Sequence, residues 1–251
     1  MKNKEIFFAR SDSQKMISAF EKAQDTFKYF WRELYWENRR IVPALDVAYV
    51  KVAFSQYVEG LDEPKVEHMW INNIYFDGEM VEGVLLNTPN ELTNVKNGDR
   101  VEIPLSQVSD WLFSTRDKTY GGFTIQVLRS EMTEKERKEH DEAWGLDFGD
   151  YNDVLLVYEQ KEHPENLIEH PMSKNMQANF AEYLKENLGI LTEKDDKGYS
   201  ILHLETIAGN ASIIEVLRQF GIDINDKTDS GRTAMDFAKL LNWTHIMPLI
   251  S

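Results

Sequence analysis

The residues of this sequence best suited to acid–base chemistry lie in a short run at positions 67–70, EHMW. His68 could act as a general base if a carboxylate oriented its ring. Glu67 cannot do this from the same strand, because successive side chains of a strand point to opposite faces. Asp99 or Asp110 could reach His68 from a neighbouring strand. A histidine held by hydrogen bonds within a sheet is the commoner arrangement, so we expect a structural role for His68 and keep an enzyme with a site around it as an alternative.

The histidines show no metal-binding pattern. No H-E-x-x-H or other paired spacing places two of them on one face of an element. His163 and His170, on either side of Pro164, would be the best pair for zinc. We therefore expect no metal and no cofactor. The six histidines are His68, His140, His163, His170, His203 and His245.

Phosphate binding and nucleophilic catalysis also lack their motifs. Gly98-Asp99 and Gly121-Gly122 are expected to form turns, because glycine adopts backbone angles that other residues avoid. Neither pair has the spacing of a phosphate-binding loop, and neither is expected to lead into a helix. No G-x-S-x-G occurs, and the lack of cysteine excludes thiolate catalysis and disulfides. An enzyme is therefore the less favoured interpretation.

The composition is that of a folded, acidic protein. Of its 251 residues, 42% are apolar and 12% aromatic, which is enough for a core and argues against disorder. The 43 Asp and Glu residues outnumber the 28 Lys and Arg residues and give a net charge of −15. Such a surface repels nucleic acid and anionic membranes, so we expect neither as a partner. The charge serves solubility, or it attracts a basic protein.

The length of the chain predicts its number of domains, and its N-terminal residues bear on its cellular compartment. A chain of this length is about twice the commonest domain size, which predicts two domains. Only four weakly apolar residues, at 6–9, follow the charged start, and this is shorter than the apolar core of a signal peptide. No run of about 20 apolar residues could form a membrane helix. We expect a soluble, cytoplasmic protein.

The first part of the chain changes from a helical period to a strand period. Apolar residues at three- and four-residue spacing between 16 and 34 predict a helix, with Ser11 and Gln14 as its capping box and Pro43 beyond its end. Four or five strands are expected between 47 and 128, with a hairpin turn at Asp77-Gly78 and a strand at 123–127. The expected fold class is α+β, with an N-terminal helix and a mainly antiparallel sheet.

Two further elements and a boundary follow. The run at 133–136 has the pattern of a capping box, and it predicts a charged surface helix that Gly145 ends. Residues 154–158 are expected to form a short buried strand. The polar stretch at 159–165 predicts a boundary. We therefore assign residues 1–160 to the α+β domain, 161–174 to a connector and 175–251 to a second, all-α domain.

The last quarter of the chain contains an internal repeat. Residues 198–203 (GYSILH) and 231–236 (GRTAMD) align with a shift of 33, the period of ankyrin repeats. The pattern resembles the ankyrin family, which implies a stack of antiparallel helix pairs and a hydrogen-bonding role for His203. Glu205 and Thr206 depart from it, because the family usually has small Ala residues there. Residues 176–188 resemble one helix of a partial first repeat. Two units and a partial cap are few, so we expect the stack to depend on the rest of the chain for stability.

The loops between these helix pairs are the best candidates for a binding surface. In repeat proteins such loops project from the stack and form a binding face. Here they are mostly charged, and an ordinary solvated loop remains the alternative. The residues expected to bind a partner are Lys194, Asp196, Lys197, Asp226, Lys227, Asp229 and Arg232.

The strand region is similar to the YegJ-like bacterial family, a domain of unknown function. The resemblance runs from about residue 7 to 132 and implies an architecture but no activity. Two later segments, 143–149 (AWGLDFG) and 169–173 (EHPMS), resemble those found where this domain precedes ankyrin repeats. The matching segments are 49–54 (YVKVAF), 67–71 (EHMWI), 83–89 (GVLLNTP), 96–101 (KNGDRV), 109–111 (SDW) and 121–124 (GGFT).

These observations favour a cytoplasmic protein that binds another protein through its ankyrin stack and needs no cofactor. A basic partner would suit the acidic surface. Similar bacterial domains are associated with toxin immunity, and this analogy makes an immunity protein one alternative. An enzyme with a site around His68 is the other.

Overall fold

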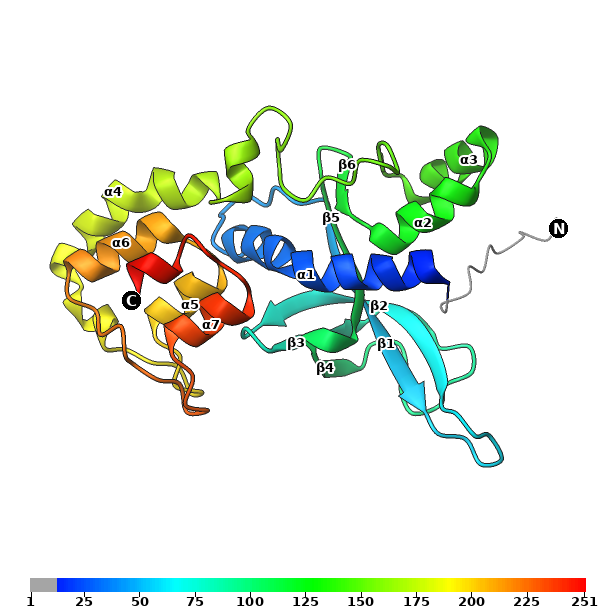
Figure 1. Cartoon of the computed structure of the whole chain (residues 1–251), viewed down its shortest axis with the longest axis horizontal. Coiled ribbons are helices and arrows are strands. Elements are labelled where there is room, and N and C mark those ends of the chain that lie inside the picture. The colour runs from blue at the N-terminus through cyan, green and yellow to red at the C-terminus, as the bar shows by residue number, and fades with distance from the viewer. Residues whose placement is uncertain (1–12) are drawn as a thin grey trace. The chain divides into compact units, whose positions relative to one another are not determined.

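The computed structural model describes residues 13–251. The chain forms two compact units. The first unit comprises residues up to 30 together with 41–156, and the second comprises residues 31–40 together with 157–251. Helix α1 (Gln14–Glu37), which is labelled in Figure 1, therefore contributes residues to both units. Among the described residues, no helix combines the length and the apolar character that crossing a membrane requires.

Helix α1 has the apolar stripe that its sequence predicts. Within the first unit its residues Met16, Ala23, Phe27 and Phe30 are buried. Ser13 begins the helix, because its hydroxyl accepts a hydrogen bond from the backbone N–H of Met16 at 3.2 Å. The expected cap at Ser11 lies outside the described residues. The helix ends at Glu37, before Pro43.

The described part of the first unit contains one six-stranded sheet in the order β4-β3-β2-β1-β5-β6. Every neighbouring pair is antiparallel, which confirms the predicted N-terminal helix with a mainly antiparallel sheet. A short 3-10 helix, η1 (Leu105–Gln107), separates β4 from β5. The strands are β1 (Val47–Gln56), β2 (Lys65–Phe76), β3 (Met80–Leu85), β4 (Arg100–Pro104), β5 (Val108–Thr115) and β6 (Lys118–Gly121).

The predicted turn at Asp77-Gly78 joins β2 to β3. The Asp77 carboxylate accepts hydrogen bonds from the backbone N–H groups of Glu79 and Met80, at 3.0 and 2.8 Å. Gly78 has a φ of 103°, which a side chain would strain. The local sequence therefore fixes this hairpin, as expected.

The prediction of a strand at 123–127 was wrong, and so was the prediction that Gly121-Gly122 leads into no helix. Gly122 instead precedes helix α2 (Phe123–Glu131). The polar residues of this segment do not form a solvent-exposed face. Gln126 is buried because its side chain donates to the carbonyl of Phe148 at 2.8 Å. Buried polar residues that have hydrogen-bond partners alternate here with apolar residues, and this gives the same sequence pattern as a half-exposed strand.

Two later predictions had different outcomes. Helix α3 (Glu134–Trp144) has the expected capping box between Thr133 and Glu136, and it ends at Gly145 with a φ of 68°. The strand expected at 154–158 is absent from the structure, which has an irregular segment there. The carbonyl of Leu155 accepts one hydrogen bond from the N–H of Gly121, at 2.8 Å. One bond orders the segment without extending the sheet.

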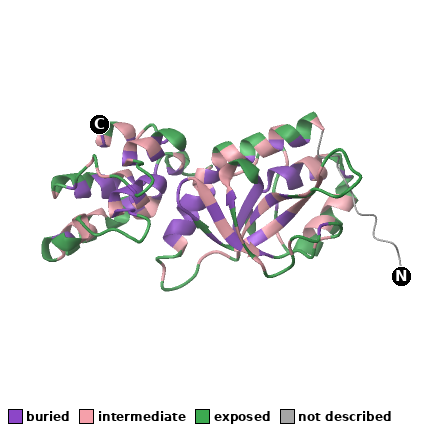
Figure 2. Ribbon diagram, turned by 90° about the horizontal axis from the view of Figure 1, so that it is seen from below, coloured by how far each residue is buried: buried purple, intermediate pink, exposed green. Residues whose placement is uncertain are grey.

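The second unit is helical in its C-terminal part. The helix expected at 176–188 begins earlier, at Pro171. Figure 2 shows buried residues on the sheet of the first unit and on these short helices. The helices are η2 (Pro164–Leu167), α4 (Pro171–Glu186), η3 (Leu188–Leu191), α5 (Ile201–Ile207), α6 (Ala211–Gln219), α7 (Ala234–Leu240) and η4 (Met247–Leu249).

The internal repeat of the sequence is also a repeat of local structure. Helices α5 and α7 begin at 201 and 234 and end at 207 and 240, so both ends are shifted by 33. An isolated antiparallel bridge precedes each helix, at Lys194 with Ser200 and at Lys227 with Thr233. Ser200 and Thr233 then form the N-terminal capping boxes. Equivalent residues therefore form equivalent turns and caps.

Candidate functional sites

His68 lies on β2, beside Phe20 of α1. The two rings stack with their centroids 5.0 Å apart. Burial and the nearby positive charge of Lys51 lower the pKa of His68 to about 4. The imidazole is therefore neutral at physiological pH. Its Nδ1 atom is buried and forms no hydrogen bond with the described residues.

Asp110 lies fully buried within β5. One carboxylate oxygen accepts the N–H groups of Trp111 and Phe123, at 2.8 and 2.9 Å. The other accepts the N–H and the hydroxyl of Thr124, at 2.8 and 2.5 Å. Asp110 thus accepts hydrogen bonds from the buried N–H groups at the start of α2, which have no acceptor within the helix, at the position where a phosphate would bind in a phosphate-binding loop.

Lys51 is the neighbour of Asp110 on the adjacent strand. The two residues are directly paired between β1 and β5, so their side chains share a face of the sheet. The Lys51 ammonium lies 3.4 Å from the Thr124 hydroxyl and 5.4 Å from the centre of the Trp70 ring. Burial raises the pKa of Asp110 and lowers that of Lys51, although each charge partly offsets the effect on the other.

The carboxylates that could have oriented His68 have other roles. Asp110 binds α2, and Asp99 accepts the N–H of Lys96 at 2.9 Å. Glu67 accepts three backbone N–H groups, from residues 90, 91 and 92. Within the part of the chain that the structure describes, none of these carboxylates forms a hydrogen bond with His68. The arrangement positions loops and a helix, and it supplies no base–orienter pair.

We predict that His68 makes the first unit less stable in mild acid. Its pKa is about 4 in the folded chain and about 6.5 when unfolded, so the unfolded state binds the proton first. Stability from this group is complete above pH 6.5 and is lost as the pH falls towards 4. The loss should be about 2 kcal/mol after allowance for partial exposure.

Chemical unfolding at several pH values, followed by tryptophan fluorescence, would measure this effect. The His68→Gln variant should show a shallower loss of stability between pH 6.5 and 4.5. The His163→Gln variant is the control, because that side chain is 54% exposed. Parallel pH profiles for His68→Gln and the unsubstituted protein would contradict the prediction, as would an NMR titration that places the pKa of His68 near 6.5.

The histidines proposed for zinc have separate surroundings. His163 lies at the surface with its Nδ1 3.1 Å from a Glu165 oxygen. His170 is buried, its Nδ1 accepts the N–H of Met172 at 3.0 Å, and its Nε2 lies 3.1 Å from Glu33. No group of three or more potential ligands occurs among residues 13–251.

The charged loops that precede α5 and α7 are joined to each other. The Lys194 ammonium lies 2.5 Å from an Asp226 carboxylate oxygen and 2.9 Å from the carbonyl of Lys227. The N–H of Asp229 donates to the carbonyl of Lys197 at 3.1 Å. His203 joins the same region, with its Nδ1 accepting the N–H of Ser200 and its Nε2 3.1 Å from the carbonyl of Asp226. Two of the predicted partner-binding residues, Lys194 and Asp226, therefore hold the loops together.

The other predicted binding residues face solvent. The two loops are held at a fixed spacing by the contacts above, so these side chains form one mixed-charge surface. It carries three positive and two negative side chains, whereas the chain as a whole has a net charge of −15. The exposed members are Asp196, Lys197, Lys227, Asp229 and Arg232.

A buried polar cluster around Glu205 was not predicted. Its carboxylate accepts hydrogen bonds from the Tyr35 hydroxyl at 2.9 Å and from Asn210 Nδ2 at 2.7 Å, and it pairs with Arg39 at 2.7 Å. Trp36 Nε1 donates to Asn210 Oδ1 at 3.0 Å. The cluster joins residues 31–40 to the helices of the second unit. The one sequence signal was the departure of Glu205 from the ankyrin pattern.

The fold and these contacts define the class of protein: an α+β domain with an antiparallel sheet, followed by a region of short repeated helices. The chain belongs to the bacterial family DUF2314, whose model, described as "Uncharacterized protein conserved in bacteria", matches residues 13–148. This confirms the predicted family of the first part.

Two relatives are also similar to the chain. A protein of Neisseria meningitidis serogroup B (strain ATCC BAA-335 / MC58) with the name "Putative ankyrin repeat protein" is 50% identical over 245 residues, which are 98% of this chain and 96% of that protein. The "Uncharacterized protein YegJ" of Escherichia coli K12 is 35% identical over 78 residues, 31% of this chain and 51% of that protein. No solved structure matches the chain significantly.

Proposed function

We propose that this protein binds another protein through an ankyrin-type stack formed by the short helices of the second unit. The shift of 33 residues between α5 and α7 equals the ankyrin period. The matching bridges, caps and His203 contacts support the same assignment. The name of the Neisseria meningitidis relative, which aligns with almost the whole chain, agrees with it.

One observation carries the proposal: two successive charged loops are locked together while their outer side chains face solvent. The Lys194–Asp226 ion pair and the backbone contact between 229 and 197 fix the spacing of the loops. A surface that is already ordered loses less conformational entropy on binding than a mobile one. The exposed Asp196, Lys227 and Asp229 side chains can therefore act as a preformed set of charged contacts.

The partner is a protein with charged groups complementary to this mixed surface. Exposed charges contribute more to partner choice and association rate than to affinity. A basic protein is favoured over long distances by the net charge of −15. The proposed function needs no cofactor.

We predict that reversing two loop charges abolishes capture of the partner from the native cell. The variant Asp196→Lys/Lys227→Glu exchanges the signs locally but keeps the net charge at −15. It also leaves the Lys194–Asp226 pair intact. Affinity capture followed by mass spectrometry should recover a partner with the unsubstituted protein and not with this variant.

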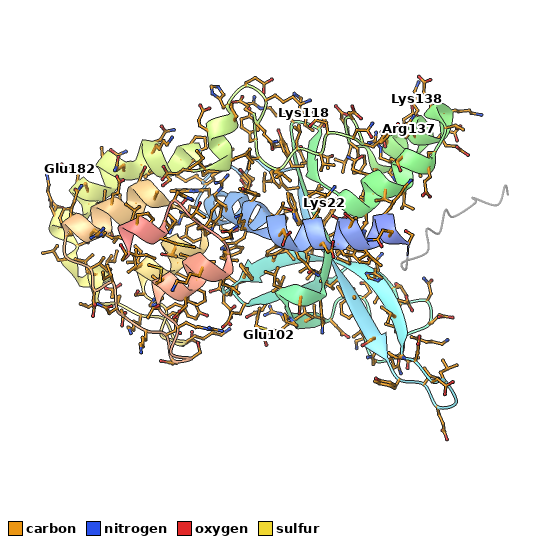
Figure 3. The ribbon with its side chains drawn as sticks, viewed as in Figure 1. Lys22, Glu102, Lys118, Arg137, Lys138 and Glu182 are labelled. Carbon is orange, nitrogen blue, oxygen red and sulfur yellow. The ribbon has the colours of Figure 1, made fainter. Side chains whose placement is uncertain are left out.

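A matched control makes the same exchange on α4. Glu182 and Lys185 form an exposed pair there at 2.6 Å, and Figure 3 labels Glu182. The variant Glu182→Lys/Lys185→Glu should recover the partner as well as the unsubstituted protein does. Equal recovery by the loop variant would show that the loops are not the binding surface.

A further inference from the structure

The loop that joins β1 to β2, residues 57–64, exposes apolar side chains. Tyr57 is 80% exposed and Leu61 is 49% exposed, and Val58 is also exposed. The loop extends away from the sheet at the lower right of Figure 1. Single exposed apolar residues are common, but an aromatic and an aliphatic residue on one projecting turn resemble the anchors of protein interfaces.

The base of this loop is ordered by the chain beside it. Gln56 accepts the N–H of Thr93 at 2.7 Å and donates to the Thr93 hydroxyl at 2.9 Å. Asn94 donates to the carbonyl of Ser55 at 3.0 Å. At the tip, the N–H of Leu61 donates to the carbonyl of Val58 at 3.1 Å. The apolar side chains are thus presented on a formed hairpin, which lowers the entropy cost of docking.

The tip carries charge of one sign. Glu59, Asp62 and Glu63 are exposed, and residues 57–64 contain no Lys or Arg. The nearest cation along the chain, Lys65, is paired with Glu91 at 3.3 Å. A cleft with an apolar floor and a basic rim complements this combination, because the anchors need burial while the carboxylates need cations.

We propose that the loop at 57–64 inserts into a basic cleft on a partner protein, with Tyr57 and Leu61 as its apolar anchors. Glu59, Asp62 and Glu63 then contact Lys and Arg side chains at the rim of the cleft. A second copy of this chain is disfavoured as the occupant, because both copies carry a charge of −15. The inference is independent of the proposed function, since the loop belongs to the first unit and the charged loops to the second.

The test replaces Tyr57 with the photoreactive residue benzoylphenylalanine in the native cell. Val42, which is 76% exposed in the same unit, receives the same residue as a control. We expect irradiation to cross-link position 57, and not position 42, to one basic protein. Cross-linking to a second copy, to lipid or to no protein would overturn the proposal.

The captured protein is then purified and titrated against the full-length chain by calorimetry. Tyr57→Ala/Leu61→Ala should weaken binding at least about thirtyfold, as truncation of interface anchors does. Glu59→Gln/Asp62→Gln/Glu63→Gln should slow association and reduce its dependence on salt. Unchanged affinity and salt dependence in both variants would refute the proposal. The Asp196→Lys/Lys227→Glu variant should bind as the unsubstituted protein does, which separates this inference from the proposed function.

Discussion

The Asp110→Ala variant is expected to lose about 3–5 kcal/mol of the free energy of unfolding of the first unit, the range for a change that leaves buried donors and a buried charge without their partner. The substitution leaves the N–H groups of Phe123 and Thr124 without their acceptor at the start of α2. It also leaves Lys51 without the carboxylate that faces it across the strands. Denaturant unfolding monitored by tryptophan fluorescence, which reports on Trp111 in the core, would measure the loss.

The Asp99→Ala variant is the matched control. Asp99 belongs to the same unit and was the other carboxylate considered for His68, but it accepts a single N–H near the surface. Its removal should cost about 1 kcal/mol or less. If both variants have the same stability as the unsubstituted protein, Asp110 does not hold α2 in place.

A second substitution separates the two contributions of Asp110 to stability, its hydrogen bonds to the start of α2 and its interaction with Lys51. Lys51→Met removes the unpaired ammonium and keeps an apolar stem of similar length. In the Asp110→Ala background it should restore part of the lost stability, so the double variant should be more stable than the sum of the single effects predicts. Additive effects would mean that Lys51 and Asp110 do not interact.

The parts of the fold that sequence predicted correctly depend on neighbours in the chain. Helix α1 follows from an apolar stripe. The hairpin at 77–78 follows from an aspartate whose side chain accepts the backbone N–H groups two and three residues further along the chain. The capping box at Thr133 joins residues three apart. In each case the controlling contact spans a few residues, so a local pattern is sufficient.

The parts that sequence missed depend on distant contacts. Strand β5 is buried throughout although it contains Ser109 and Asp110, because those side chains find partners on β1 and α2. Helix α2 looked like a strand because Thr124 and Gln126 alternate with apolar residues. Their buried partners lie 14 and 22 residues away, which no local period reveals.

The candidate sites also differ in how far local sequence could predict them. The charged loops could be located from the 33-residue repeat, but the repeat does not reveal that Lys194 pairs with Asp226 from the next loop. For Glu205 the sequence showed only an unusual residue. Its partner Tyr35 is 170 residues away in the chain, so the cluster required the structure.

Glu205→Ala should destabilise the second unit by about 3–4 kcal/mol, within the range for breaking a buried ion pair. This substitution restores the residue type that ankyrin repeats usually have at that position, so the repeat pattern alone predicts a neutral or stabilising effect. The structure predicts the opposite. Glu205 is 1% exposed and accepts hydrogen bonds from Tyr35 and Asn210 while it pairs with Arg39.

Removal of the carboxylate therefore leaves buried donors without an acceptor. Burial acts to lower the pKa of Arg39, but the nearby charge of Glu205 is the main cause that raises it above its ordinary value. Without Glu205 that stabilisation is lost, and the hold of the cluster on residues 31–40 weakens. Proteolysis between residues 31 and 46 should become faster in the variant, since local opening exposes the backbone.

Thr206→Ala supplies the control at the adjacent position. It also restores the usual small residue, but Thr206 is buried with a hydroxyl that has no hydrogen-bond partner among residues 13–251. Its removal should change stability by about 1 kcal/mol or less, because a buried unsatisfied group contributes little when it is replaced by an apolar one. Thermal unfolding of the two variants would decide between the effect predicted from the repeat pattern and the effect predicted from the structure. A large loss for Glu205→Ala alone would mean that Glu205 attaches residues 31–40 to the helices of the second unit, whereas equal midpoints would mean that the cluster adds no stability.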